Sequence, residues 1–537
     1  MSTTLTNSIS AEVNAAVAGI TVIDRAQPVA TQDTSDTPKV TSVGATSNPK
    51  ADRFCTRYAH LIAEYGDPIS FNDNDTMSLN EMLFAAKFAE DQDVIFSPEE
   101  NRFYAYDPKT GLWSTLTEGG LRLKIHRDVF AVAKAEGIAI EMGFKLTNRQ
   151  LTALTNLLKG FCERRDAFST AHNLIHLRNG MLDLSTGTPT LLPFAPDYYS
   201  RNQIPFVYNP TAACPRFIGD LLKPALPDDD IDLLQRWAGS VLLGGDRAQR
   251  FLIMHGLAGG GKSTLISVIE SLIGEHNIAT LRPSLLAESR FETSRFISKT
   301  LLVGKDVRSD FLSDKAISYL KSLTGGDRMT AELKGSNEVV QIRGNFALVI
   351  TANALPKLTL DNDADAWRRR LLVVPFTGKK PATPVPDFAG VLAREEGEGI
   401  LAWMVEGAMK HLAELKSRGS FILTPTQQAR IDGMLAESNS VEEFVKANVI
   451  TSKIHDLSGD EMLSAYEKHC QKLDWAPVSA QAFRTKVKQV MLEKFGLTQS
   501  HDLIRYEQTV RGFRGVTLKF VPSTTPTATS SIDDLPF

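Results

Sequence analysis

The sequence has few cysteines, and none of them form a CxxC pair. The four, Cys55, Cys162, Cys214 and Cys470, are far apart in a chain of 537 residues. This spacing argues against a zinc ribbon and against a disulfide framework. We therefore expect ordinary buried thiols.

The chain also lacks a long apolar run and an excess of basic residues. Its hydrophobic content of 42% is typical of soluble domains, and no apolar stretch approaches the length that crosses a bilayer. The start, MSTTLTNSISAEVNAAVAGI, has no basic region and no apolar core, so we expect a cytoplasmic protein. The formal net charge of -4 excludes no nucleic-acid partner, because only the contacting surface needs to be basic.

Composition divides the chain into five parts. We expect a disordered lead-in over residues 1–50, a mixed, mainly helical domain over 51–245, and a motor domain over 246–425. A small winged-helix domain over 438–521 and a disordered tail over 522–537 follow. The motor region alternates apolar strands with helical periods, which predicts an α/β fold with a parallel sheet.

A phosphate-binding loop is the strongest signal in the motor region. The loop motif GxxxxGK followed by Ser or Thr lies between the apolar strand 250–255 and a predicted helix 263–273. Its candidate nucleotide-binding residues are Gly256, Gly259, Gly260, Gly261, Lys262, Ser263 and Thr264. The glycines let the backbone N–H groups face phosphates, Lys262 meets the β- and γ-phosphates, and Ser263 supplies a Mg²⁺ ligand.

Two further strands end in polar residues that suit the same chemistry. Asp306 follows the buried run LLVGK and is the candidate second metal ligand and water-polarising acid. Asn353 ends ALVITAN and is placed to orient the attacking water or sense the γ-phosphate. A strand-end cap is the alternative for Asp306.

Arginines precede the next strand, LLVVPF. Arg369 and Arg370, in Trp367-Arg-Arg-Arg, are candidates for stabilising transition-state charge at a neighbouring subunit's nucleotide. A solvated basic turn and a DNA phosphate contact are the alternatives.

Five motifs, taken in order, resemble those of the superfamily-three helicases, specifically the helicase part of phage and plasmid primase-helicases. They are GLAGGGKST, LLVGKD, KSLTGGD, VITANALP and WRRRLLVVPF. The resemblance covers about residues 103–425, and the primase motifs are not found. It implies a hexameric ring of AAA+ type that uses ATP and Mg²⁺ and moves on single-stranded or forked DNA in a bacterial host cell. One departure is a single Asp306 where such proteins more often have Glu or an acidic pair, which leaves the catalytic base open.

The resemblance also implies a DNA-gripping β-hairpin, which residues 329–343 match, with Lys334 at its turn as the candidate phosphate contact. In the predicted winged-helix domain, Arg484, Lys486 and Lys488 are candidate DNA contacts. The final DDLPF resembles the acidic tip by which single-strand binding proteins recruit replication partners, so host replication proteins are candidate partners. An ATP-switched DNA-binding initiator or loader that unwinds nothing is the alternative function.

Overall fold

A computed structural model of the chain describes residues 56–519 apart from short gaps. The gaps are 75, 136–140, 143, 145, 169–172, 245–246, 309–313, 335–338, 345, 357 and 359–362. The predicted lead-in and the DDLPF tail lie outside the described residues.

The first part of the described chain packs helices around a three-stranded antiparallel sheet. Its elements are α3 (Ala59–Tyr65), β1 (Ile69–Phe71), β2 (Met77–Leu79), α4 (Glu81–Asp91), β3 (Val94–Ser97), β4 (Arg102–Asp107), β5 (Leu112–Leu116), α5 (Glu118–Ala135) and α7 (Asn148–Phe161). The residues before α4 pair with β1 up to Leu79 and do not extend the helix. Asn80 then caps α4, its side chain accepting from the backbone N–H of Leu83 at 3.1 Å.

A second small sheet leads into the motor region. It contains β6 (Leu174–Leu177), β7 (Gly180–Asp183) and β8 (Thr190–Leu192), and is followed by the short helix η1 (Pro196–Tyr198), the π-helix η2 (Phe217–Leu222) and α8 (Asp228–Leu242). Helix α8 is buried along most of its length and shares one hydrophobic core with the large sheet that follows. Helix α8 and the strands of the large sheet thus belong to one continuous core.

A five-stranded parallel sheet forms the centre of the motor region. Its strands are β9 (Phe251–His255), β10 (Ile278–Thr280), β11 (Leu301–Val307), β14 (Ala347–Ala352) and β15 (Leu371–Pro375), in the order β10-β11-β14-β9-β15. Every neighbouring pair is parallel. The predicted parallel α/β sheet is confirmed, and all five carboxyl ends lie at one edge.

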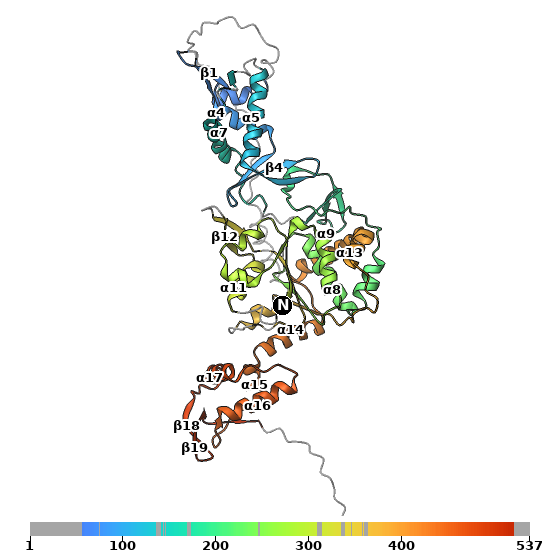
Figure 1. Cartoon of the computed structure of the whole chain (residues 1–537), viewed down its shortest axis with the longest axis vertical. Helices are drawn as coiled ribbons and strands as arrows, with labels where there is room; N and C mark the ends of the chain where they lie inside the picture. The colour runs from blue at the N-terminus through green and yellow to red at the C-terminus, as the bar shows by residue number, and fades with distance from the viewer. Residues whose placement is uncertain are drawn as a thin grey trace, which may run out of the picture. The chain divides into compact units, whose positions relative to one another are not determined.

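Alternate residues of these strands enter two different cores. Leu252 and Met254 of β9 face a core made with α8, α9 (Lys262–Ile273) and α13 (Phe388–Arg418). Phe251 and Ile253 face the opposite core. That second side carries α10 (Pro283–Glu288), α11 (Asp314–Gly325), α12 (Ala364–Arg368), α14 (Pro425–Ser438) and the short helix η4 (Thr293–Phe296), whereas the short helix η3 (Glu275–Asn277) contacts α9. Figure 1 shows α9, α8 and α13 on one side of the sheet and α11 on the other. Both faces are thus covered, as the near-continuous apolar strands require.

Helices α8 and α13 approach each other closely at two glycines. A Cβ atom on Gly239 would lie 2.0 Å from the backbone N of Ala408, and one on Gly407 would lie 1.9 Å from the carbonyl oxygen of Gln235. A side chain at either position would force the helices apart. Helix α8 is also tied to α14, because buried Asp230 accepts from the Arg430 guanidinium at 2.7 and 2.8 Å.

The hairpin that the sequence predicted is present. Strands β12 (Arg328–Glu332) and β13 (Val339–Arg343) pair antiparallel, with Arg328 opposite Arg343 and Glu332 opposite Val339. The inward residues Met329, Ala331, Val340 and Ile342 join the second core. The other face of the hairpin is exposed.

The last described part contains three helices and several short strands, two of which lie between its first and second helices. They are α15 (Ser440–Asn448), β16 (Val449–Thr451), β17 (Leu457–Ser458), α16 (Gly459–Lys472), α17 (Ala480–Phe495), β18 (Ser500–Arg505), β19 (Gln508–Phe513) and β20 (Val516–Leu518). A core of its own unites the three helices. Its assignment as a winged helix stays a prediction. Among the described helices, none has the length and apolar composition needed to span a bilayer.

Candidate nucleotide-binding site

The loop after β9 adopts backbone angles that favour glycine. Gly256, Gly259 and Gly261 have φ values of 142°, 83° and 99°, in the left-handed half of conformational space. Gly256 is also constrained sterically, because a Cβ there would lie 2.1 Å from the carbonyl oxygen of Phe376. The loop ends at Gly261, the N-cap of α9, so its backbone N–H groups and the helix N-terminus face the same space.

Lys262 folds back over this loop. Its ammonium group donates to the carbonyl oxygens of Gly256 at 2.6 Å and Leu257 at 3.0 Å, and the residue is only 3% exposed. Burial lowers the pKa of Lys262, while the charge of Asp306 acts in the opposite direction. His255, the last residue of β9, also has its pKa lowered, by burial and by the charges of Arg430 and Lys262. The buried ammonium group of Lys262 favours an anionic ligand, because an incoming negative charge would offset the cost of burying it.

A cavity of about 470 Å³ opens above the loop. It brings together most of the predicted nucleotide-site residues: Gly259, Gly260, Gly261, Lys262, Ser263, Thr264, Asp306 and Asn353. Asp306 follows the buried part of β11 and Asn353 follows β14, so both lie at the carboxyl edge of the sheet. Ser263 and Asp306 offer oxygen ligands of the kind that Mg²⁺ takes.

Asp306 is held in an unusual backbone conformation. Its φ is 46°, and the pairing of β11 with β14 is irregular between Gly304 and Val307. Its backbone N–H donates to the hydroxyl oxygen of buried Thr351 on β14 at 2.9 Å. Left-handed non-glycine residues are found where the surroundings enforce them, and often at functional sites. Here the irregularity leaves the exposed carboxylate lining the cavity.

Several lining residues were missed by the sequence analysis. They are Asp220, Leu221, Pro224, Ala225, Ala258, Gly378, Lys379, Pro381 and Phe388. The first two lie on η2, whose leading N–H groups, those of Arg216 and Phe217, donate to the buried carboxylate of Glu396 at 2.9 and 2.8 Å. Lys379 had a usable signal, because it comes shortly after the apolar run LLVVPF, much as Asp306 comes after the apolar run LLVGK.

Arg369 and Arg370 are not brought to the cavity. They precede β15, at the amino edge of the sheet, where the backbone N–H of Phe251 donates to the carbonyl oxygen of Arg370 at 2.8 Å. The Arg370 side chain donates to the carbonyl oxygen of Ala366 at 2.9 Å. Arg369 is exposed. Within one chain, neither arginine lines the cavity that holds Lys262.

Lys334 lies just beyond β12 and is exposed. The remaining turn residues, 335–338, are outside the described part of the chain. On α17, Arg484 pairs with Asp460 at 2.9 Å, Lys486 is half-buried and Lys488 is exposed.

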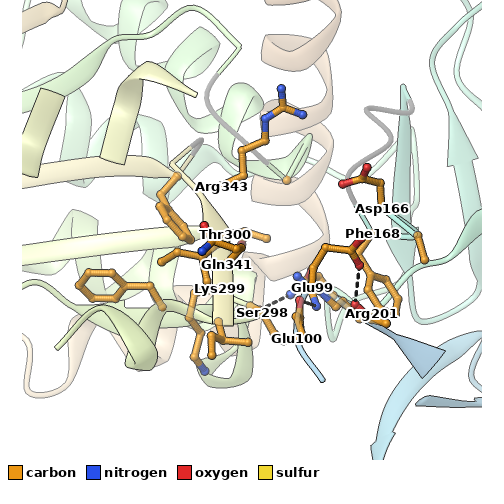
Figure 2. A pocket seen from close by; sticks show the side chains of 18 of the residues that line it. Glu99, Glu100, Asp166, Phe168, Arg201, Ser298, Lys299, Thr300, Gln341 and Arg343 are labelled. Carbon is orange, nitrogen blue, oxygen red and sulfur yellow. Dashed lines mark hydrogen bonds and ion pairs between the residues drawn. The ribbon is translucent and has the colours of Figure 1, made fainter. Parts of the chain in front are cut away.

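A second cavity, of about 200 Å³, lies between the β3–β4 turn and the hairpin base. Figure 2 shows Glu100 and Arg201 facing each other in it; their side chains lie 2.6 Å apart. On the other wall the backbone N–H of Gln341 donates to the carbonyl oxygen of Glu99 at 3.1 Å. The Arg343 guanidinium points away from the Glu100–Arg201 pair in this view. This cavity contains no loop of phosphate-binding type.

The expected buried thiols are confirmed for the three cysteines that the structure describes. Cys162, Cys214 and Cys470 are free and buried, and burial raises the pKa of Cys162 and of Cys214 to about 12. No group of three or more metal-binding side chains occurs among the described residues.

Two sequence families match parts of the chain. Residues 81–223 match a family described as D5 N terminal like, and residues 254–370 match a family of unknown function, DUF5906. No curated protein matches. The D5 match in the region before the loop fits a replication helicase of the phage type.

Solved structures of the NrS-1 C terminal region also match. Two of them, "The A form apo structure of NrS-1 C terminal region-CTR" and "The apo structure of NrS-1 C terminal region (305-718)", are each 12% identical to this chain, with TM-scores of 0.41 and 0.42. They cover 80% and 81% of this chain, and the match spans 97% and 99% of those chains. Because these TM-scores are low, the fold described above rests on this chain's own strand order and packing.

Proposed function

We propose that this chain is an ATP-dependent DNA helicase of the superfamily-three, AAA+ type, which moves on single-stranded DNA as a hexameric ring during replication of a phage, plasmid or other mobile element. One observation carries the proposal: the phosphate-binding loop, Asp306 and Asn353 line a single cavity at the carboxyl edge of a parallel sheet. Ligands of open α/β sheets bind at this edge.

The residues divide the work of ATP hydrolysis. The loop N–H groups and Lys262 hold the phosphates, and Ser263 and Asp306 would hold Mg²⁺ and its water shell, where the ion neutralises phosphate charge. Asn353, which lines the same cavity, would orient the water that attacks the γ-phosphorus as the bond to the β–γ bridging oxygen breaks. In a ring, Arg369 or Arg370 would reach the nucleotide of the adjacent subunit from the opposite edge of the sheet.

Coupling to DNA is assigned to the β12–β13 hairpin. Its inner face is fixed in the core, and Gln341 at its base is bonded to Glu99, whereas Lys334 beyond β12 is exposed and would meet a polynucleotide. The strands that lead to and from the turn are thus held in the core of the motor region, which would let a phosphate contact at Lys334 move with the motor.

Strand displacement from a forked DNA tests this proposal directly. The wild-type chain should hydrolyse ATP, be stimulated by single-stranded DNA and displace the strand, whereas Lys262→Ala should abolish hydrolysis and displacement. Lys334→Ala should keep basal hydrolysis and lose most displacement, about tenfold for a phosphate contact. ATP hydrolysis without displacement by the wild-type ring would instead identify an initiator or loader.

A further inference from the structure

Lys379 reaches the nucleotide cavity from a segment that the loop motif does not include. It follows β15, the edge strand beside β9. After the strand, the backbone N–H of Phe376 donates to the carbonyl oxygen of His255 at 2.7 Å, and that of Thr377 to Ala225 at 3.1 Å. These two bonds fix the direction in which the chain leaves the sheet.

The chain then presses against the phosphate-binding loop. A Cβ atom on Gly378 would lie 3.0 Å from the carbonyl oxygen of Gly260 and 2.9 Å from the Cβ of Ala225. Reciprocally, a Cβ on Gly260 would lie 3.0 Å from the carbonyl oxygen of Gly378. Backbone therefore meets backbone, and the next residue, Lys379, lines the cavity together with Lys262.

The ammonium groups of the two lysines in the cavity differ in their hydrogen bonding. Lys262 is buried and bonded to two loop carbonyls. Lys379 is exposed, and within the described residues its ammonium group has no hydrogen bond or ion pair. The acids that line the same cavity are Asp220 and Asp306; Asp220 lies 3.6 Å from the guanidinium of Arg216. Lys379 is thus a cation available to a ligand.

We propose that Lys379 binds the polyphosphate of the nucleotide in its own subunit, as a second cation beside Lys262. This inference rests on the proposed function, because it concerns the same cavity. It differs from the role of Arg369 and Arg370, which would act on a neighbour. Pro381 and Phe388 of the following segment line the same cavity, so the contact would also connect the phosphates with the start of α13.

Nucleotide titration of the full chain tests the assignment. We would measure the affinity for ATPγS and ADP with the wild-type chain, Lys379→Ala and Lys379→Arg. Lys223→Ala is the matched control, since Lys223 is exposed beside Pro224 but does not line the cavity. For an exposed cation we expect Lys379→Ala to weaken ATPγS binding about three- to tenfold, a loss that shrinks in high salt. Lys379→Arg should restore most of the affinity, and Lys223→Ala should behave as wild type.

The outcomes separate this inference from the proposed function. If the wild-type chain binds nucleotide and Lys262→Ala weakens it, but Lys379→Ala binds within twofold of wild type, the role of Lys379 is disproved and the motor site stands. If the wild-type chain binds no nucleotide, both fall. An affinity loss that persists unchanged in high salt and that Lys379→Arg does not restore would indicate a structural role and would also overturn the inference.

Discussion

Basic side chains lie at both edges of the central sheet, but they differ in whether they border a cavity or are paired within the chain. At the carboxyl edge, Lys262 and Lys379 line a cavity that the backbone of the phosphate-binding loop helps to form. At the amino edge, Arg368 is engaged with Asp365 and with Asp432, the latter at 2.7 Å, and Arg370 is engaged with the carbonyl oxygen of Ala366. The cations at the carboxyl edge thus border a cavity, whereas Arg368 and Arg370 at the amino edge are already paired with groups of the same chain.

This difference teaches which basic residues can act within one chain. A cation at the amino edge is separated from the cavity by the length of the strands, so it can serve only a neighbouring subunit or the fold. Arg369 is exposed, and its side chain has no ion pair or hydrogen bond within the described residues. It is therefore a better candidate than Arg370 for action on a neighbour.

The largest expected effect tests this asymmetry at Arg369. Arg369→Ala should lower ATP hydrolysis by the assembled ring about 10³-fold, because an arginine supplied by a neighbour stabilises transition-state charge. Nucleotide affinity should change little. Arg368→Ala is the control, since that side chain is already engaged by two aspartates. Steady-state hydrolysis and nucleotide titration provide the measurements.

Mixing two inactive variants distinguishes a neighbour's arginine from an arginine of the same chain. Rings assembled from Arg369→Ala and Lys262→Ala chains should regain part of the activity, because an intact site can then face an intact arginine. If mixtures stay as inactive as either variant alone, the contrast between the two edges does not extend to catalysis.

The next largest effect on ATP hydrolysis is expected from Asp306, at the carboxyl edge. Asp306→Asn keeps the size of the side chain but removes its charge, and should slow hydrolysis about 10²-fold or more while nucleotide binding persists. Asp220→Asn is the matched control: it lines the same cavity but belongs to η2. Hydrolysis at the wild-type rate by Asp306→Asn would show that Asp306 is a strand-end cap and that another group carries the acid's role.

The smallest expected effect is on stability and concerns His176, a buried residue that does not line the nucleotide cavity. Burial lowers its pKa to about 4, against an ordinary value of 6.5. The unfolded chain therefore takes up a proton that the folded chain refuses as the pH falls from 6.5 towards 4. The folded state should lose up to about 3 kcal/mol over that range and keep its stability above it.

Denaturant unfolding at several pH values measures this loss. His176→Gln should flatten the dependence, because glutamine can still hydrogen-bond with Ser200 and the carbonyl oxygen of Thr110, which His176 contacts at 2.7 Å each. An unchanged pH profile in the variant would assign the acid sensitivity to other groups.

The parts of the site that were predictable from sequence are those encoded within short segments. The strand, glycine turn and helix around Lys262 lie in one continuous stretch, and Asp306 and Asn353 each end an apolar run of their own. Parallel strands gather their carboxyl ends at one edge, so these separate signals could be combined without coordinates.

What sequence could not supply depends on contacts between distant segments. Lys379 joins the site only because β15 pairs with β9 and Gly378 packs on Gly260. Helix α8 likewise packs in one core with the sheet and with α13, although α13 lies far from α8 in the sequence. Local periodicity identifies such helices but does not indicate which core each one enters.

The close approach of α8 and α13 at Gly239 and Gly407 has a mechanical consequence. At these two points main chain lies against main chain, so the helices cannot move closer together or slide there without a backbone clash, and they would turn as a unit. Since the first residue of α13 borders the nucleotide cavity and α8 is joined to the chain before it, a tilt begun at the phosphates would be transmitted at once to the segments on either side of the motor.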